Sequence, residues 1–513
     1  MSNSQICMIA TIVVYLVGML AVGFVLSKQN KNSSDFYLGG RKLGPLVTAM
    51  SAEASDMSGW LLMGLPGLAL MTGLAEAAWT AIGLAIGTYL NWLIVAKRIR
   101  IYSEEIDAIT LPEFFSKRFK DKANILSLIA AVFIVVFFIP YTASGFSACG
   151  KLFATIFDME YTTAMIISAV VIVLYCTFGG FLAASTTDFV QSIVMTIALF
   201  VVLGFGEGVT HGFENVFKNV AGLDGFTNLF EGFNVAENTT GSYGALPVAS
   251  TLAWGLGYFG MPHILLRFMA IGDAKKLKTS RRVATVWVVI SMAVAVLIGV
   301  IGYSLMKNGI VGPYDSASSA ETIIIDIANK IASYGWVPAA VGGIILSGIL
   351  ASTMSTADSQ LLAAASSISQ DIVQRTFKAK LSTRASMILA RVSVIVISVI
   401  AVFLALNPNS SVFRIVSFAW AGFGATFGPI MLCSLFWKRA NKWGALAGMI
   451  SGGAMVFLWK FVIAKIGGVF AIYELLPAFI VSTIFIIVVS LLTKAPDKDI
   501  EEDFEKAKSR CKA

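Results

Sequence analysis

The sequence predicts an all-α membrane protein with thirteen transmembrane helices, and three observations support this. Apolar residues make up 57% of the 513-residue chain, only 13% of residues are charged, and the mean hydropathy is +0.80. Apolar stretches of about 20 residues, the length that crosses a bilayer, recur along the chain. Two of these stretches are interrupted by polar residues, glycine and proline, which is typical of transporters that bind solutes at the midplane.

Taken in order, the apolar stretches begin near residues 6, 45, 74, 123, 161, 188, 245, 282, 336, 385, 411, 443 and 472. The first, about 6–26, has no basic segment before it and no small-residue cleavage site after it. We therefore interpret it as a retained helix and not as a signal peptide. The five cysteines show no paired or metal-like spacing, so neither a disulfide scaffold nor a zinc site is expected.

The distribution of lysine and arginine predicts which loops face the cytoplasm, because cytoplasmic loops retain these residues. Of the 38 basic residues, 29 fall in alternate loops and in the tail, at 28–44, 97–122, 271–282, 371–384, 438–442 and 494–513. The opposite set of loops holds six. We expect the amino terminus outside and the tail in the cytoplasm of a multi-pass plasma-membrane protein. The net charge of +8 is then a topology signal and requires no nucleic-acid partner.

Two loops also carry helix-start signals. Thr110 with Glu113 resembles a capping box, and so does Ser318 with Glu321. The first predicts a helix on the cytoplasmic surface over 108–119. The second predicts a helix over the external vestibule, where it would act as a lid or serve only as a connector.

The first interrupted stretch, residues 51–67, is broken at its centre by a carboxylate, three serines, a glycine and a tryptophan in an apolar context. An ionised side chain in mid-bilayer costs about 2.5–3.5 kcal/mol, so the polar groups here are expected to serve a site. The second interruption, within 245–270, holds three glycines and a proline. In a helix interior, glycine costs about 1 kcal/mol and proline about 3 kcal/mol, so a regular helix is not expected here.

The two interrupted stretches stand five spans apart, and five is an odd number. The second to sixth spans and the seventh to eleventh must then run in opposite directions, which is the pattern of an inverted repeat. This gives five segments: 1–44 with the first helix and a cytoplasmic loop, repeats at 45–208 and 245–437, two further helices at 438–493, and a cytoplasmic tail at 494–513.

A third polar cluster lies in the ninth span, where Ser352, Ser355 and Thr356 fall on one helical face. Each hydroxyl has a purely structural alternative, which is a hydrogen bond to a carbonyl one turn earlier. Three of them on one face, beside two broken helices, favour a site for a hard cation such as sodium. Neutral oxygens suit such an ion.

The sequence at this point resembles the solute:sodium symporter family. The resemblance runs from about residue 6 to 495, and it rests on the motifs Tyr37-Leu-Gly-Gly-Arg41, Ser51 to Gly67, Pro140-Tyr-Thr-Ala-Ser-Gly145, Phe178-Gly-Gly-Phe-Leu-Ala183, Trp254 to Ala270, Met354-Ser-Thr356 and Ala419-Trp-Ala-Gly-Phe-Gly424. It implies the leucine-transporter fold and L-proline uptake driven by sodium through alternating access. No cofactor besides the coupling ion and no protein partner is expected.

The resemblance also implies roles for individual residues. The sodium ligands would be carbonyls and hydroxyls of Ala54, Met57, Ser352, Ser355 and Thr356. Residues tied to sodium coupling would be Asp56, Ser58, Gly59, Arg41 and Asp188, the last near the inner sodium exit. The substrate pocket would be formed by Trp60, Tyr141, Trp254, Tyr258 and Pro262.

A small cyclic amino acid fits this pocket chemically. The free N–H groups of a broken helix bind a carboxylate, and aromatic walls suit an apolar ring and an ammonium group. Trp254 and Tyr258 lie four residues apart, so they share one face if the helical turn between them is intact. Pro262 would free the carbonyl of Tyr258.

Three positions depart from the family pattern. Thr186 stands where tryptophan is usual, so the lining of the inner exit is open; Ser352 replaces alanine, which leaves the carbonyl in place. Glu53 stands where some relatives have glycine, and it is either a carboxylate without a role or one that alters ion preference. His263 is interpreted as a packing histidine.

Other functions remain as alternatives. Another solute of the same family, such as pantothenate, a betaine-like osmolyte or a sugar, would use the same machinery. A channel would show conductance that solute does not saturate, and a membrane sensor would need a signalling domain larger than the tail at 494–513. An enzyme is not expected, because no nucleophile–base pair, metal cluster or phosphate-binding loop is present in the sequence.

Overall fold

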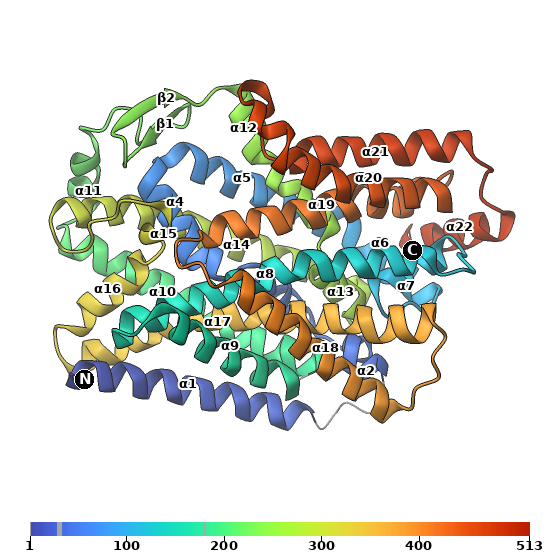
Figure 1. Cartoon of the computed structure of the whole chain (residues 1–513), viewed down its shortest axis with the longest axis horizontal. Helices are drawn as coiled ribbons and strands as arrows, with labels where there is room; N and C mark the ends of the chain where they lie inside the picture. Colours follow the sequence, from blue (N-terminus) through green and yellow to red (C-terminus); the bar gives the residue numbers. More distant parts are fainter. Residues whose placement is uncertain (1, 28–32, 179, 513) are drawn as a thin grey trace.

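The computed structural model describes residues 2–27, 33–178 and 180–512, and its helices run mainly along the long axis of the molecule (Figure 1). The loops therefore gather at two ends. One end, here called the hairpin end, carries α11 (Phe213–Val220), α15 (Ala317–Ala320), α16 (Ile323–Ala332) and a β-hairpin. The other, the tail end, carries α7 (Leu111–Arg118) and α22 (Lys498–Lys512). The two marked chain ends lie at opposite ends of the molecule (Figure 1).

Ten helices in the described part of the chain are long and apolar enough to cross a membrane. They are formed by α1 (Asn3–Ser27), α5 (Leu74–Leu90) continuing through η3 (Asn91–Val95) into α6 (Ala96–Glu105), α8 (Ile125–Phe157), α10 (Phe181–Val209), α14 (Leu277–Lys307) preceded by η5 (Ala274–Lys276), α17 (Trp336–Ser366) continuing into η6 (Ser367–Thr376), α18 (Thr383–Leu404), α19 (Val412–Phe436), α20 (Lys442–Phe461) and α21 (Leu475–Leu492). A shorter apolar helix, α9 (Tyr161–Phe178), lies between α8 and α10 in sequence. Large apolar side chains on α1, α18 and α21 are exposed, as Val14, Phe403 and Leu492 illustrate, and this exposure suits a lipid environment.

Two further segments are the predicted broken helices. The first consists of α3 (Pro45–Asp56), η2 (Trp60–Gly64) and α4 (Leu65–Thr72), and the helical backbone is interrupted at Met57, whose ψ is 72°. The second consists of α12 (Ala245–Leu252), η4 (Ala253–Gly260) and α13 (Pro262–Ala270). It is interrupted at Met261, whose ψ of 111° is the extended conformation that a following proline favours.

The condition for a shared face of Trp254 and Tyr258, an intact α-helical turn between them, is not met, because η4 is a 3₁₀ helix. With about three residues per turn, residues four apart differ in direction by about 120°. Close packing accounts for the glycines of this segment. A Cβ at Gly257 would lie 1.9 Å from the indole nitrogen of Trp420, and one at Gly260 would lie 2.3 Å from the carbonyl oxygen of Phe423.

The all-α expectation fails in the segment between α11 and α12. There β1 (Glu231–Asn234) and β2 (Thr239–Ser242) pair antiparallel, with Phe233 opposite Thr240. The buried ring of Phe233 packs on Phe226 at 5.9 Å between centroids. Strands of four residues with one buried side chain are too short to produce a recognisable alternating pattern.

The two loop predictions have different outcomes. The capping box at Thr110 is confirmed in part: its hydroxyl accepts from the N–H of Glu113, whose carboxylate accepts from Ile109 instead of Thr110. The box proposed for Ser318 and Glu321 is wrong. The cap of α15 is formed by Ser316 and Ser319.

The remaining elements are short. They are α2 (Ser33–Leu38), η1 (Gly39–Arg41), η7 (Ile463–Ile466) and η8 (Gly468–Phe470). Of the predicted cytoplasmic loop 28–44, residues 28–32 lie outside the described residues, as does Gly179 of the motif at 178–183. In the tail, α22 contacts α6 through ion pairs of Arg510 with Glu104 and Glu105.

Candidate functional site

The two broken helices meet through a hydrogen bond between Asp56 and Tyr258. The phenol of Tyr258, in η4, donates to one carboxylate oxygen of Asp56 at 2.6 Å. Asp56 is fully buried, and its other carboxylate oxygen has no hydrogen-bond partner among the described residues. Because an unsatisfied buried carboxylate is costly, this junction is a candidate for a functional site.

Two other predicted pocket residues hold the backbone at the same break. The indole N–H of Trp60 donates to the carbonyl of Asp56 at 2.9 Å, and the hydroxyl of Tyr141 donates to the same oxygen at 3.2 Å. Trp60 follows the break, and Tyr141 comes from the middle of α8 beside Pro140. The structure thus brings Asp56, Trp60, Tyr141 and Tyr258 together.

Trp254 lies on the side of this group that faces the hairpin end. Its ring is 6.3 Å from that of Trp60 and 5.1 Å from those of Phe413 and Tyr473. It also lines a cavity of about 670 Å³ at the hairpin end, which we call the vestibule. Trp254 therefore lines the vestibule and also lies beside the ring of Trp60.

Trp420, on α19, is a contact residue that had no predicted role. Its indole N–H donates to the carbonyl of Trp254 at 2.8 Å, and its ring stands edge-on to Tyr258 at 5.0 Å. The signal was the motif at 419–424, in which tryptophan is set among glycine and alanine.

Pro262 acts as the first residue of α13, and the expected free carbonyl of Tyr258 has a partner elsewhere. The side-chain amide of Asn91, at the end of α5, donates to that carbonyl at 3.0 Å. Asn91 was also missed by sequence reasoning, although an amide inside an apolar span is a detectable signal. The ring of His263, which follows Pro262, lies 5.7 Å from that of Phe138, as expected of a packing histidine.

One hydrogen bond joins the predicted sodium ligands of α17 to those of α3, and two more join ligands within α17. The hydroxyl of Ser355 donates to the carbonyl of Ala54 at 2.7 Å and is 3.2 Å from the carbonyl of Ser352. The hydroxyl of Thr356 donates to that same carbonyl at 3.0 Å. The fifth, Met57, is the C-cap of α3, where the helical backbone ends. The hydroxyls of Ser355 and Thr356 therefore make the back-bonds of the structural alternative, and that of Ser355 also reaches the end of α3.

These oxygens are chemically suited to a hard monovalent cation. All are neutral carbonyl or hydroxyl oxygens, and they are almost completely buried. The hydroxyl of Ser352 itself bonds back to Ile349, so only the carbonyl of Ser352 faces its neighbours. Replacement of alanine by serine at 352 consequently leaves this donor set unchanged.

The predicted coupling residues fall into three places. Ser58 and Gly59 form the break itself, and a Cβ at Gly59 would lie 2.9 Å from the Cβ of Ala148. Asp188, on α10, accepts from Ser51 at 2.7 Å and pairs with Arg267 at 2.9 Å. Arg267, on α13, is buried and also donates to Ser359 on α17. It therefore links the second broken helix to α10 and α17 on the tail-end side of the site.

Arg41 is the predicted site residue that the structure places elsewhere. Its guanidinium donates to the carbonyls of Ala108 and Met269 at 2.7 Å and to the hydroxyl of Ser103 at 3.0 Å. Burial, with a smaller contribution from Arg100, lowers the pKa of Arg41 to about 10. It remains cationic at neutral pH and anchors the tail-end termini of α6 and α13.

The two unusual positions have defined environments. One carboxylate oxygen of Glu53 accepts from the indole of Trp92 at 2.8 Å, while the other has no hydrogen-bond partner within the described ranges. Glu53 is 1% exposed, one turn before Asp56. Thr186 bonds back to Leu182 within α10.

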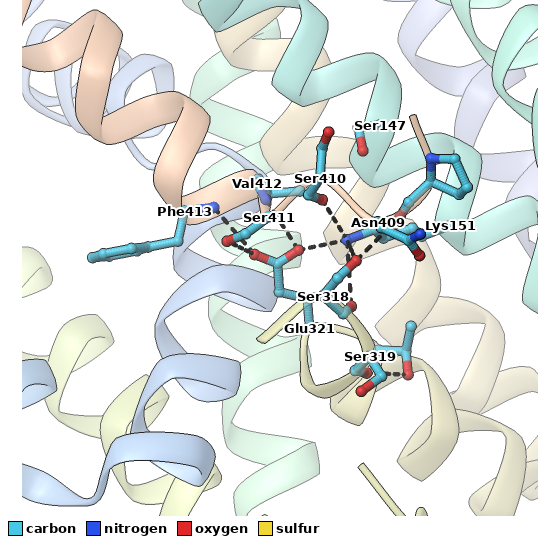
Figure 2. A network of polar contacts seen from close by, with 12 residues as sticks. Ser147, Lys151, Ser318, Ser319, Glu321, Asn409, Ser410, Ser411, Val412 and Phe413 are labelled. Carbon is cyan, nitrogen blue, oxygen red and sulfur yellow. Dashed lines mark hydrogen bonds and ion pairs between the residues drawn. The ribbon is translucent and has the colours of Figure 1, made fainter. Parts of the chain in front are cut away.

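At the hairpin end, a buried ion pair joins three elements around Glu321 (Figure 2). Lys151, on α8, lies 2.7 Å from the carboxylate of Glu321. The same carboxylate accepts from the backbone N–H groups of Val412 and Phe413 and therefore caps α19. Because its carboxylate is engaged with Lys151 and α19, Glu321 is not available for the capping box that was predicted with Ser318.

The chain is similar to known proteins in sequence and in fold. A family model described as "Sodium:solute symporter family" matches residues 36–452. The osmoregulated proline transporter OpuE of Bacillus subtilis is 43% identical over 488 residues, covering 94% of each chain. The sodium/proline symporter of Haemophilus influenzae is 43% identical over 512 residues, covering 98% of each.

Two solved structures share the fold. The substrate-bound outward-open state of a Na⁺-coupled sialic acid symporter has a TM-score of 0.76 at 17% identity, over 96% of this chain and 99% of that one. A nucleobase-cation-symport-1 family transporter in a closed conformation has a TM-score of 0.55 at 13% identity, over 92% and 99%. At these identities the likeness concerns the fold alone.

Proposed function

The chain belongs to the sodium:solute symporter family, and we propose that it imports L-proline together with sodium by alternating access. It is a multi-pass membrane transporter and not an enzyme. The observation that carries the substrate is the 43% identity, over nearly the whole chain, to proteins named as proline transporters. The Asp56–Tyr258 contact between two broken helices supplies a site of the required kind.

For sodium, we assign the carbonyls of Ala54, Met57 and Ser352 and the hydroxyls of Ser355 and Thr356. The support is the hydrogen bond from the hydroxyl of Ser355 on α17 to the carbonyl of Ala54 near the end of α3, together with the bond from Thr356 to Ser352 on the same face of α17. An ion at this position would hold the two elements together. Asp56, Ser58, Gly59 and Asp188 then couple the ion to the solute through the backbone of the break, and Arg41 contributes from the tail end by fixing helix termini.

For proline, we assign Trp60, Tyr141, Trp254, Tyr258 and Pro262. The broken helices offer positive ends and free N–H groups for the carboxylate. The aromatic rings around Asp56 suit the apolar ring and the secondary ammonium. Pro262 acts indirectly, because it ends η4 and so fixes Tyr258.

We further propose thirteen transmembrane segments with an inverted repeat at 45–208 and 245–437. Counting the two broken helices and α9 with the ten long helices supports this number. The first helix with its cytoplasmic loop, at 1–44, and the two helices at 438–493 are additions outside the repeats. The tail at 494–513 is cytoplasmic. With the amino terminus outside, the hairpin end faces the exterior of a cell membrane.

One sodium ion per proline suffices energetically for uptake. Moving one charge through about 100 mV yields roughly 2.3 kcal/mol. A tenfold sodium gradient adds about 1.4 kcal/mol. Together these support roughly several-hundredfold accumulation of proline.

Uptake of radiolabelled proline into proteoliposomes tests the proposal. Under an imposed inward sodium gradient we expect accumulation, which collapses when the gradient is removed. Pantothenate, glycine betaine and sugars serve as competitors. Sodium-driven uptake that one of these blocks better than unlabelled proline does would assign the protein to another solute of the family.

A further inference from the structure

Five buried polar side chains form a group that we call the Glu53 cluster: Glu53, Asp56, Thr88, Asn91 and Tyr258. None of them is more than 1% exposed. Glu53 and Asp56 lie three residues apart on α3, and Thr88 and Asn91 lie three residues apart where α5 continues into η3, so each pair shares a helical face. Tyr258 belongs to η4. The cluster thus joins both broken helices to the span that follows the first of them.

Hydrogen bonds hold the cluster together and use its donors. The phenol of Tyr258 donates to Asp56 at 2.6 Å, and the side-chain amide of Asn91 donates to the carbonyl of Tyr258 at 3.0 Å. This second bond fixes the orientation of the Asn91 amide, so that its free atom is the oxygen. The hydroxyl of Thr88 lies near the phenol of Tyr258.

Four oxygens of the cluster are buried without a hydrogen-bond partner among the described residues. They are one carboxylate oxygen each of Glu53 and Asp56, the amide oxygen of Asn91 and the hydroxyl of Thr88. The other oxygen of Glu53 accepts from the indole of Trp92 at 2.8 Å, so the carboxylate is held in place. Buried polar atoms are costly without a partner, and four of them in one cluster indicate a missing ligand.

The charges of the cluster indicate that this ligand is a cation. Glu53 and Asp56 act electrostatically on each other, and in the described part of the chain no basic side chain acts on either carboxylate. Two buried carboxylates one turn apart repel each other unless a positive charge compensates them. Carboxylate, amide and hydroxyl oxygens are the ligands that hard cations prefer.

We propose that the Glu53 cluster binds a second sodium ion, distinct from the ion assigned between α3 and α17. Ala54 contacts α17 through Ser355, whereas Glu53 contacts η3 through Trp92, so the two sites are built with different neighbours of α3. η3 is a π-helix, an irregularity that is frequent at functional sites. The inference rests on the proposed function, because sodium is the ion that the chain is proposed to couple.

A second coupled ion changes the limit of accumulation. Under a tenfold sodium gradient without a membrane potential, one coupled ion supports about tenfold accumulation of proline and two support about a hundredfold. Glu53 then sets the number of ions that move with each proline. Asp56 contributes to both the second ion and the contact with Tyr258, so it links that ion to the solute site.

Binding of radiolabelled sodium to the purified full chain at saturating proline counts the ions. We expect two per chain in the wild type. Glu53→Gln keeps the size of the side chain and an acceptor for Trp92 but removes the charge, and it should retain one ion with its affinity unchanged within about twofold. Thr88→Val should weaken one of the two ions by roughly tenfold or more, whereas Thr88→Ser should not.

Asp371→Asn is the matched control. Asp371 is also fully buried and has one carboxylate oxygen without a hydrogen-bond partner in the described chain, but it lies in η6 at the tail end. This variant should keep two ions. The ion that remains in Glu53→Gln reports folding within the same measurement.

The outcomes separate this inference from the proposed function. One sodium ion in the wild type, or two in Glu53→Gln, overturns the second site while the proposed function stands. One sodium ion together with one proton taken up per proline, the proton being lost in Glu53→Gln, overturns sodium as the ligand of the cluster. No sodium-dependent proline binding in the wild type overturns the proposed function and this inference with it.

Discussion

The contact between Tyr258 and Asp56 allows the ring and the hydroxyl of one residue to be tested separately. Tyr258→Ala removes a buried ring that stands 5.0 Å from Trp420. Losing an aromatic wall beside a small bound ring costs about 1–2 kcal/mol, roughly five- to thirtyfold in affinity. We therefore expect Tyr258→Ala to weaken proline binding at saturating sodium by that factor, with normal abundance in the membrane.

Tyr258→Phe keeps the ring and deletes only the donor to Asp56. A hydrogen bond to a charged group contributes about 1.5–3 kcal/mol. Asp56 lies between Ala54 and Met57 in sequence, so a carboxylate that loses its donor disturbs the backbone carbonyls assigned to sodium. We expect the sodium concentration for half-maximal binding to rise by roughly tenfold or more, while proline affinity at saturating sodium changes less than threefold.

The assay is direct proline binding in detergent, titrated with sodium and then with proline. Tyr314→Phe is the matched control, because the hydroxyl of Tyr314 also donates to a carboxylate, that of Asp326, at 2.7 Å and at the hairpin end. This control should leave both titrations unchanged. Wild-type proline affinity in well-folded Tyr258→Ala would refute the assignment of Tyr258 to the pocket, and equal sodium dependence in Tyr258→Phe would refute its link to the ion.

Three further predictions test other parts of the assignment. Thr356→Ala should raise the sodium requirement for uptake without loss of abundance; unchanged sodium dependence would remove Thr356 from the ion site. In a chain without native cysteines, a cysteine at Lys218 should react with an impermeant thiol reagent in whole cells and one at Lys276 should not, whereas the reverse labelling would invert the topology. Lys151→Met should lower the free energy of unfolding by about 3–5 kcal/mol, because it leaves the buried carboxylate of Glu321 unpaired. The double variant Lys151→Met with Glu321→Gln should recover part of that loss. Equal free energies of unfolding for the single and the double variant would argue against a stabilising role of the ion pair.

The sequence predicted the positions of the interruptions because local chemistry determines them. A proline at 262 cannot donate a backbone hydrogen bond, and the residue before it avoids the helical region; with three glycines just before it, this favours a break there, whereas Pro140 alone leaves α8 continuous. The hydroxyl face of the ninth span follows in the same way from helical periodicity. Neither inference required knowledge of a partner.

The type of the second interruption was not predictable in the same way. Gly257 and Gly260 allow η4 to approach α19 so closely that a Cβ would collide with Trp420 or Phe423. Glycine in a span indicates that something approaches, but not which helix approaches or whether the segment winds as α or 3₁₀. The directions of Trp254 and Tyr258 therefore depended on packing that only the folded chain reveals.

The same limit explains why partners of polar groups were missed while the groups themselves were found. An unpaired polar group in a membrane requires a partner, so Asp56 and the carbonyl of Tyr258 signalled a site from sequence alone. Their partners are separated by about the length of a repeat or more: Asn91 reaches Tyr258 across 167 residues, and Tyr258 reaches Asp56 across 202. Glu321 shows the reverse error, because a local capping pattern suggested a partner three residues away when the carboxylate binds Lys151 and α19. A buried carboxylate accepts whichever donors the fold delivers, and for Glu321 these come from Lys151 in the first half of the chain and from the start of α19 about 90 residues further on.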